Sequence, residues 1–510
     1  MKRLLYFYLG IACLYLLTSS GRIAGRDALA MFKVAANIVE HASVSAEPCQ
    51  AGPAMPQCVK GIDGRNYSSY GVFPSVAVAP VFFLAGPVSS IARMEKTIIA
   101  GFFVSMLCAL IAAIVPAAMA HWVTLMGYSW RAAVFTGIVC SFGSPFWHYG
   151  VKEFYSEPYM ALGLVISALL LLHGDSSNAF AVAGLFLGVA CASRIVAVLE
   201  VPLFVAVFAY RVWRVPGRIT NLVFFLAPLG AVLAGMGILN RLHYGSFFRT
   251  AYQANFTLSG MFSTPMYEGI FGYLFGGDTS LILFCPIILL SAWGFSKLFR
   301  TNGLDATLCL GTFVFHTMLL AKYEEWNSEW SYGPRFLIPV LPFALLPLCT
   351  LFESRLASAR RGQIAAYTLL AISIAINIPS AMYPLNRYHL TNKWASARSG
   401  SPVYLGCLKT MITDLPEVLS ETVHFNPNKR VANPLLNDTA EENSLDATQY
   451  SELKVFFDSL PNPINIKTVD LWWVKIGLLF KRYFLLAAGS ACFLFVVGWA
   501  SIQFSLTMSD

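Results

Sequence analysis

The chain has 510 residues, of which 57% are hydrophobic and only 12% charged, and its mean hydropathy is +0.61. These values exclude an ordinary soluble domain, in which about a quarter of the residues are charged. The formal net charge of +8 does not indicate a nucleic-acid partner, because the basic residues are scattered in short clusters between apolar runs. We expect an all-α, polytopic membrane protein.

Recurring apolar runs predict about twelve transmembrane helices, since about 20 apolar residues cross the hydrocarbon layer. The first run starts with Lys2 and Arg3 like a signal peptide, but no small-residue cleavage pattern follows, so we interpret it as a retained span. The predicted spans lie near 4–20, 97–120, 131–148, 157–173, 178–193, 197–211, 219–239, 281–298, 304–321, 335–352, 364–383 and 484–504.

The apolar segment 72–91 is long enough to cross but contains Pro74, Pro80 and Pro87, so it is either a further span or a re-entrant element. The positive-inside rule favours an element that dips in and returns to the outer face. Basic clusters at 211–218, 297–300 and 355–361 then fall on the same side as Lys2 and Arg3, although Arg93 and Lys96 fall outside.

This topology predicts three parts of the chain. Residues 1–383 form a transmembrane catalytic domain with a first outer loop at 21–96, residues 384–483 form a polar outer-face loop or small lobe, and residues 484–510 form the last helix and tail. The polar loops that can carry chemistry lie on the outer face, and the inner loops are short and basic. Cys49 and Cys58 both lie in the first outer loop, where an oxidising compartment would permit a disulfide, and both outcomes remain open.

Three acidic residues at the ends of predicted spans are candidate catalytic groups. Asp27 opens a predicted helix that runs to about His41; it is either a helix cap or a base that takes a proton from an acceptor hydroxyl. Glu153 and Glu157 follow a span, and a carboxylate at the mouth of an apolar helix is costly without a partner.

Two arginines are candidate phosphate contacts, because the planar guanidinium suits phosphate oxygens. Arg194 divides a long apolar run, and its alternative role is a structural tie to Glu200 or to backbone carbonyls. Arg335 ends a polar and aromatic cluster that is typical of a sugar-binding surface; the cluster also contains Glu324, Glu325, Trp326, Glu329, Trp330 and Tyr332.

Other candidate binding residues lie in outer loops. Asp63 and Gly64 predict a hairpin turn that places Tyr67 and Tyr70 at the membrane interface. Arg241 and His243 are candidate phosphate contacts, although a lone interfacial histidine is more often only an amphipathic surface residue.

The order of these pieces resembles the GT-C superfamily of glycosyltransferases that use lipid-phosphate sugars. It is most similar to the bacterial branch related to protein O-mannosyltransferases and the aminoarabinose transferases of lipid A. The resemblance covers 1–383 and consists of Asp27 in the first outer loop, followed by IVEHASVS, GIDGRNYSSYG, EFYSEP, SRIVAVLEVP, NRLHYGSFFRTAY and WSYGPRFLIPVLP.

The resemblance implies an inverting transfer from a polyprenyl-phosphate sugar to a hydroxyl of a glycan, lipid or protein, at the outer face of a bacterial inner membrane. Asp27 would be the general base, Glu153 or Glu157 would assist, and Arg194 or Arg335 would hold the donor phosphate. The 72–91 element would take the prenyl chain. The donor sugar remains open among a hexose, a pentose and an amino sugar.

The chain departs from the family at one point: many members have two adjacent acids in the first loop, and here Arg26 precedes Asp27. A single carboxylate is a poor divalent-cation site, so no cofactor is assigned and a divalent cation stays open. The alternative function is a transporter or flippase of lipid-linked sugars, which usually carries ionisable residues near the membrane midplane. An envelope assembly protein would not need the acidic and aromatic cluster before Arg335.

Overall fold

Long apolar helices dominate the computed structural model, which describes residues 1–23, 25–49, 57–213, 220–255, 258–328, 331–351, 360–385, 406–424, 468–479 and 484–507. Among these residues, six helices are long and apolar enough to cross a membrane. This confirms an all-α polytopic membrane protein, whereas the count of about twelve spans stays a prediction. The six are Lys96–Leu125, Ile195–Trp213, Thr220–Tyr244, Gly303–Ala321, Gly362–Met382 and Phe484–Thr507.

Most helices begin and end near the predicted residues, because uncharged runs are bounded by polar residues that remain at the membrane surface. Helix α5 is the longest, with 30 residues. The main helices are α1 (Lys2–Thr18), α2 (Arg26–His41), α5 (Lys96–Leu125), α6 (Trp130–Phe142), α7 (Phe146–Val151), α8 (Glu157–His173), α9 (Ser177–Ser193), α10 (Val201–Trp213), α11 (Thr220–Tyr244), α16 (Leu289–Thr301), α17 (Gly303–Ala321), α20 (Arg360–Met382) and α27 (Phe484–Thr507).

Three predicted spans are broken in the structure. The 131–148 run divides into α6 and α7 at Gly143 to Pro145, and the 281–298 run becomes α15 (Leu281–Phe284), η2 (Pro286–Ile288) and α16. The 335–352 run is not one helix but η3 (Arg335–Leu337), α18 (Leu341–Leu345) and η4 (Leu346–Leu351). Each break has a proline at or beside it, which removes a backbone donor and clashes with the preceding turn. Proline alone does not end a helix here, because α5 and α11 continue through Pro116 and Pro228.

The 72–91 element is a bent pair of helices, α3 (Val72–Val78) and α4 (Val81–Ala92), which meet at 45°. Helix α3 packs on α2 and α9, and α4 packs on α5. Phe83, Leu84 and Ile91 on α4 are largely exposed. The bend agrees with an interrupted element, and its return to the outer face stays a prediction.

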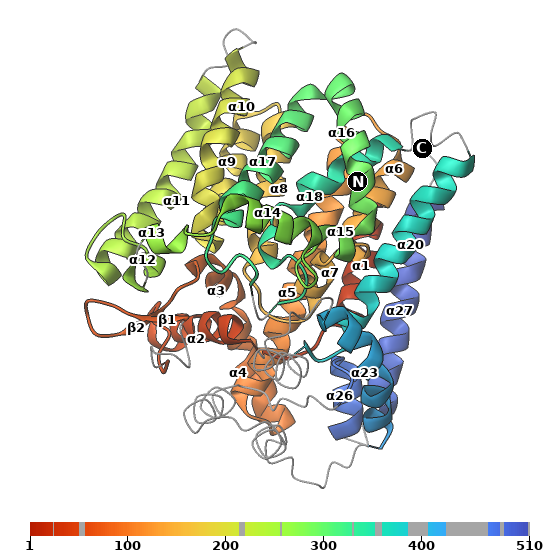
Figure 1. Ribbon diagram of the computed structural model, residues 1–510. Helices are drawn as coiled ribbons and strands as arrows, with labels where there is room; N and C mark the ends of the chain where they lie inside the picture. The colour runs from red at the N-terminus through yellow and green to blue at the C-terminus, as the bar shows by residue number, and fades with distance from the viewer. Residues whose placement is uncertain are drawn as a thin grey trace.

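Most helices pack into one large apolar core, and α2, α3 and α4 form a second apolar cluster against α5. In Figure 1, α9 and α11 lie side by side at one edge of the bundle, and α1 lies beside α27 at the opposite edge. The first and last helices approach closely because Gly10 has no side chain. A Cβ at this position would lie only 2.4 Å from Ile502. The two ends of the chain are therefore packed into one layer.

Short elements cover one end of the bundle (Figure 1). They include the β-hairpin of β1 (Cys58–Lys60) and β2 (Asn66–Ser68), in which Val59 pairs with Tyr67. Its turn spans five residues, 61–65, with Gly64 at a φ of +83°, so the predicted hairpin is confirmed with a longer turn. The remaining helices are the short α12 (Ala251–Asn255), α13 (Leu258–Met261), α14 (Met266–Phe275) and α26 (Trp472–Leu479) and the 18-residue α23 (Gly406–Val423).

The opposite end of the bundle holds the amino terminus and the turns of α5–α6 and α16–α17. Tyr128 bonds Thr301 at 2.8 Å, and Ser505 donates to the carbonyl of Arg3 at 2.9 Å. Arg3 lies in the first turn of α1, and Arg211 and Arg300 lie in the last turns of α10 and α16. This grouping agrees with the predicted placement of basic residues on one side.

Most of the predicted polar lobe at 384–483 lies outside the described residues. Its described parts pack against the bundle: Met411 and Val418 of α23 join Tyr383 and Tyr332 in an apolar cluster. Helix α26 packs on α1 and α27. The division of the chain at 383 and 484 stays a prediction.

Candidate functional site

Four charged side chains meet at the covered end of the bundle. We call Asp27, Glu157, Arg194 and Arg335 the carboxylate–arginine quartet. Two carboxylates and two guanidinium groups give a formal charge of zero. The four residues are far apart in the sequence, so four separate segments of the fold build the cluster.

Each member lies where a helix begins or ends. Asp27 is in the first turn of α2 and Glu157 opens α8, where a carboxylate is stabilised by the positive end of the helix dipole. Arg194 is the extended residue between α9 and η1, and Arg335 opens η3. Helix ends thus hold all four charges near one end of the apolar bundle and not in the middle of its spans, where an unpaired charge is most costly.

Asp27 is not the cap of its helix, contrary to one of the two predicted roles. Gly25 occupies the N-cap position and no side chain caps the helix. The Asp27 carboxylate instead accepts a charge-assisted hydrogen bond from Nη2 of Arg335. The predicted end of the helix at His41 is confirmed.

Glu157 connects the two arginines. Its Oε1 accepts from Nε of Arg335 at 2.6 Å and also from Nη1 of Arg194. The predicted alternative of a tie between Arg194 and Glu200 is wrong, because Glu200 bonds Nδ1 of His316 at 2.9 Å. Arg335 therefore bridges both carboxylates, and its loss would separate them.

Exposure differs within the quartet in a way that suggests different roles. The Glu157 side chain has no exposed surface, whereas 11% of Asp27, 11% of Arg194 and 12% of Arg335 remain exposed. Glu157 thus holds the two arginines from the buried side. The other three members keep surface that a ligand can contact.

Aromatic side chains surround the charges. The Arg335 guanidinium lies 5.1 Å from the ring centre of Tyr155, and that of Arg194 lies 5.3 Å from the ring centre of Phe336. Both distances fit cation–π contacts. Burial, followed by the nearby Asp27 charge, raises the pKa of Tyr70 well above its usual value, so this phenol stays a neutral hydrogen-bond donor beside the quartet.

A buried histidine supports the segment that carries Arg335. His316 of α17 contacts Glu200 through Nδ1 and the carbonyl of Phe336 through Nε2, at 3.1 Å. A carbonyl only accepts, so Nε2 carries the proton. This contact fixes the backbone directly after Arg335, and the sequence analysis did not identify it.

Glu153 lies near the quartet but outside it. It is buried, and a Cβ on Gly25 would lie 2.1 Å from its Oε2, so the glycine makes room for this carboxyl at the start of α2. Burial raises the pKa of Glu153 to about 7, against the opposing effect of Arg22. Its Oε2 has no hydrogen-bond partner among the described residues.

The raised pKa predicts a pH-dependent stability. The unfolded chain loses the Glu153 proton near the ordinary glutamate value, whereas the folded chain keeps it to about pH 7. The stabilisation is therefore complete below the unfolded pKa and is lost as the pH rises toward 7. Between pH 5 and about 7, the unfolding temperature of the wild type should fall relative to Glu153→Gln. Thermal scans of both proteins check this, with Glu40→Gln as the control; parallel curves would contradict it.

The hairpin lines a cavity of about 100 Å³ next to the quartet. Tyr67 stacks on His243 with ring centres 3.7 Å apart and donates to Asp63 at 2.7 Å. Tyr70, Tyr244 and Tyr252 also line the cavity. Aromatic walls with a few polar groups are typical of ligand sites. The structure places Tyr67, Tyr70 and His243 in one cavity wall, whereas the sequence analysis named them in separate loops, and their role in binding stays a prediction.

The hairpin is joined to the preceding loop by a disulfide between Cys49 and Cys58, which resolves the alternative left open above. Replacing both cysteines by serine should lower the free energy of unfolding by about 2 kcal/mol, because the cross-link restricts the unfolded chain. Thermal unfolding with and without a reductant measures this. A reductant should destabilise the wild type and leave the double serine variant unchanged; an equal response of the two proteins would contradict the role of this bond.

Several predicted binding residues lie apart from the quartet. Glu324, Glu325 and Arg241 are exposed, and Trp326 packs its ring 5.7 Å from that of Tyr273. Of the described residues of the 323–335 cluster, Arg335 alone pairs with members of the quartet. Glu329 lies outside the described residues.

The donor set does not favour a divalent cation. Among the described residues, no three His, Cys, Asp or Glu side chains come together as a metal group. Both quartet carboxylates are paired with arginine, so a cation would have to displace a guanidinium. The question of a divalent cofactor left open by the sequence therefore receives no support from these ligands.

Comparison with known proteins finds similar solved structures, and two of them are structures of one membrane protein. No family model and no curated protein matches the chain. It is similar to ArnT from Cupriavidus metallidurans bound to undecaprenyl phosphate, with a TM-score of 0.47 and coverage of 97% of this chain and 77% of that chain. The apo structure of the same ArnT gives 0.49, with 97% and 76% coverage, and both are 12% identical. Because both TM-scores are below 0.5, the function proposed below rests on the residues of this chain and not on this likeness.

Proposed function

We propose that this protein is a membrane glycosyltransferase that moves a sugar from a polyprenyl-phosphate donor to a hydroxyl acceptor at the membrane surface. The observation that carries the proposal is the quartet. It presents one carboxylate and two guanidinium groups with accessible surface at the end of an apolar bundle. Transfer from a lipid phosphate needs this combination: a base for the acceptor and positive charge for the leaving phosphate.

The reaction is a single displacement with inversion. The acceptor oxygen forms a bond to the anomeric carbon while the bond from that carbon to the phosphate oxygen breaks. The acceptor proton passes to Asp27, and the electron pair of the broken bond stays on the polyprenyl phosphate. Arg194 and Arg335 stabilise the added negative charge on this phosphate. Glu157 is a positioning residue, since it is fully buried and holds both arginines.

The bent pair α3–α4 supports the lipid part of the proposal. Gly71 precedes α3 and lies so close to the end of α9 that a Cβ there would be 2.0 Å from the carbonyl of Ala192. The element therefore starts beside Arg194 and continues into α4, where Phe83, Leu84 and Ile91 are exposed. An apolar surface that starts next to a phosphate-binding arginine suits a prenyl chain.

A donor screen tests the proposal. Purified protein is incubated with polyprenyl-phosphate hexoses, pentoses and amino sugars, and the free polyprenyl phosphate is measured by mass spectrometry. At least one donor should release polyprenyl phosphate with the wild type and not with Arg335→Gln. Equal release by both proteins would exclude the quartet as the site.

The competing function is transport of a lipid-linked sugar. Glu200 and His316 form a fully buried pair within the apolar bundle, which is a feature also found in transporters. However, the pair fixes the backbone beside Arg335, which is sufficient to explain its presence. Movement of intact donor across a vesicle membrane without cleavage would distinguish transport from transfer.

A further inference from the structure

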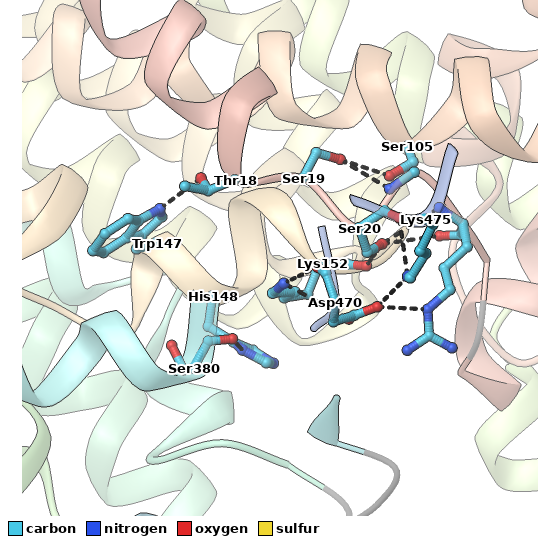
Figure 2. Close-up of polar contacts among 12 residues, drawn as sticks. Thr18, Ser19, Ser20, Ser105, Trp147, His148, Lys152, Ser380, Asp470 and Lys475 are labelled. Carbon is cyan, nitrogen blue, oxygen red and sulfur yellow. Dashed lines mark hydrogen bonds and ion pairs between the residues drawn. The ribbon is translucent and has the colours of Figure 1, made fainter. Parts of the chain in front are cut away.

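A second cluster of buried charges lies near the quartet and takes no part in the reaction described above. Asp470, just before α26, is surrounded by Arg22, Lys152 and Lys475, and we call these four residues the Asp470 cluster. Figure 2 shows Lys152 and Lys475 converging on Asp470. The side chains of Arg22, Lys152 and Asp470 are at most 5% exposed.

All three cations depend on the same acidic residue. Arg22 donates through Nε to Oδ1 of Asp470 at 2.9 Å, and Lys475 pairs with the same oxygen. Lys152 donates to the Asp470 carbonyl at 2.6 Å and lies 3.7 Å from its Oδ2. Three cations on one carboxylate leave a formal excess of two positive charges.

Uncompensated positive charge is costly in a buried site, because desolvation of each ion exceeds what a shared partner returns. The effect is visible in the amines: burial lowers the pKa of Lys152 to about 8 and that of Lys475 to about 7. Glu153 is the next acid, but its own pKa is raised to about 7. It therefore supplies only part of the missing charge.

Arg22 shows where an additional negatively charged partner would bind. Its Nη1 is buried and has no hydrogen-bond partner among the described residues. An orphaned guanidinium N–H beside two ammonium groups lacks an acceptor that carries negative charge. A phosphate or carboxylate group would satisfy the donor and offset the excess charge together.

We propose that Arg22, Lys152 and Lys475 form a second anion-binding subsite, which takes a phosphate or carboxylate group of a ligand. It is separate from Arg194 and Arg335. Glu153 lies beside both sites, because its carboxyl packs against Gly25, which stands between Arg22 and Asp27 in the chain. The subsite does not depend on the transferase function, because it follows from charge and hydrogen bonding in the free protein.

Inorganic phosphate binding to the purified full-length protein tests the subsite. The unfolding temperature is measured at increasing phosphate concentration, with choline chloride at equal ionic strength as the reference. The midpoint is the phosphate concentration at which half of the rise in unfolding temperature is reached. Phosphate should stabilise the wild type, and Arg22→Gln should raise the midpoint about tenfold, as expected for loss of a charge-assisted hydrogen bond. Lys475→Met, which removes a buried ammonium and keeps a side chain of similar length, should also raise the midpoint. Exposed Arg241→Gln is the matched control and should keep the wild-type midpoint.

Arg335→Gln separates the two sites. If phosphate occupies the Asp470 cluster, the midpoint of this variant stays near that of the wild type. A midpoint that shifts in Arg335→Gln and not in Arg22→Gln would overturn the proposal, as would a phosphate response no larger than that to chloride. Repeating the scans in nanodiscs with phosphatidic acid identifies the source. If this lipid also stabilises the wild type, needs Arg22 to do so and removes the further response to inorganic phosphate, the site is assigned to a lipid headgroup; if inorganic phosphate still acts as before, it is assigned to a soluble phosphate.

Discussion

Replacing Asp27 by asparagine is expected to lower the rate of sugar transfer by about 10² to 10⁴, the usual contribution of a positioned general base. Asparagine has the same shape and keeps an oxygen that accepts from Arg335, but it cannot take the acceptor proton. The change therefore removes the chemistry and retains the geometry. The measurement is kcat with a labelled polyprenyl-phosphate sugar at saturating donor.

The control for this variant lies on the same helix. Glu40→Gln removes an α2 carboxylate that pairs with Lys96 at 2.6 Å on the exposed surface, and such pairs contribute at most about 1 kcal/mol. It should leave kcat unchanged. If Asp27→Asn retained wild-type activity and Glu153→Gln lost it, the base would be Glu153, whose unpartnered oxygen lies beside the start of α2.

Arg335→Gln should lower the free energy of unfolding by about 3 to 5 kcal/mol, the cost of leaving a buried carboxylate without its cation. The wild-type quartet is neutral, and this variant leaves it with a net charge of −1. Adding Glu157→Gln leaves Asp27 and Arg194, which are again neutral together. The double variant should therefore be more stable than Arg335→Gln alone.

A double-mutant cycle of thermal unfolding measures this coupling between residues 335 and 157. Residues that share a hydrogen-bond network show interaction energies of about 0.5 to 3 kcal/mol. Strictly additive losses would mean that the two side chains do not act as one unit in the protein. Activity provides a separate readout. Arg335→Gln and the double variant with Glu157→Gln both lack the donor-phosphate contact of Arg335, so neither should reach wild-type kcat.

The quartet was predictable because its members are charges at the ends of apolar runs. Asp27, Glu157, Arg194 and Arg335 each interrupt or border a span, where an ionised group requires a partner. What sequence reasoning could not supply was the pairing. The order of the chain places Arg194 six residues from Glu200, yet the break after α9 turns its guanidinium toward Glu157.

The Asp470 cluster was missed for a different reason. Asp470 belongs to a segment of about a hundred residues whose polar composition predicts only a loop or lobe. Nothing local indicates that it returns to Arg22, 448 positions earlier. The aromatic and acidic cluster at 323–335 shows the opposite error, because its density of polar and aromatic residues predicted a site. Among its described residues, Glu324 and Glu325 are exposed and Arg335 alone joins the quartet.

Hydropathy located most of the helices, including α5, which continues through Pro116. The uncharged run at 98–120 became the 30-residue helix α5. The run at 335–352 was predicted as one span, but Pro339, Pro342 and Pro347 divide it into short turns. Its residues are nearly all buried, so packing against neighbouring helices, and not helix propensity, holds this segment in place.

Reconstituted protein in vesicles distinguishes transfer from transport most directly. Polyprenyl-phosphate sugar is supplied with a hydroxyl acceptor, and two quantities are measured together: cleavage of the sugar–phosphate bond and movement of intact donor between leaflets. The proposed function predicts acceptor-dependent cleavage that Asp27→Asn abolishes, with donor movement no faster than in empty vesicles. Movement of intact donor without cleavage, unaffected by Asp27→Asn, would contradict it.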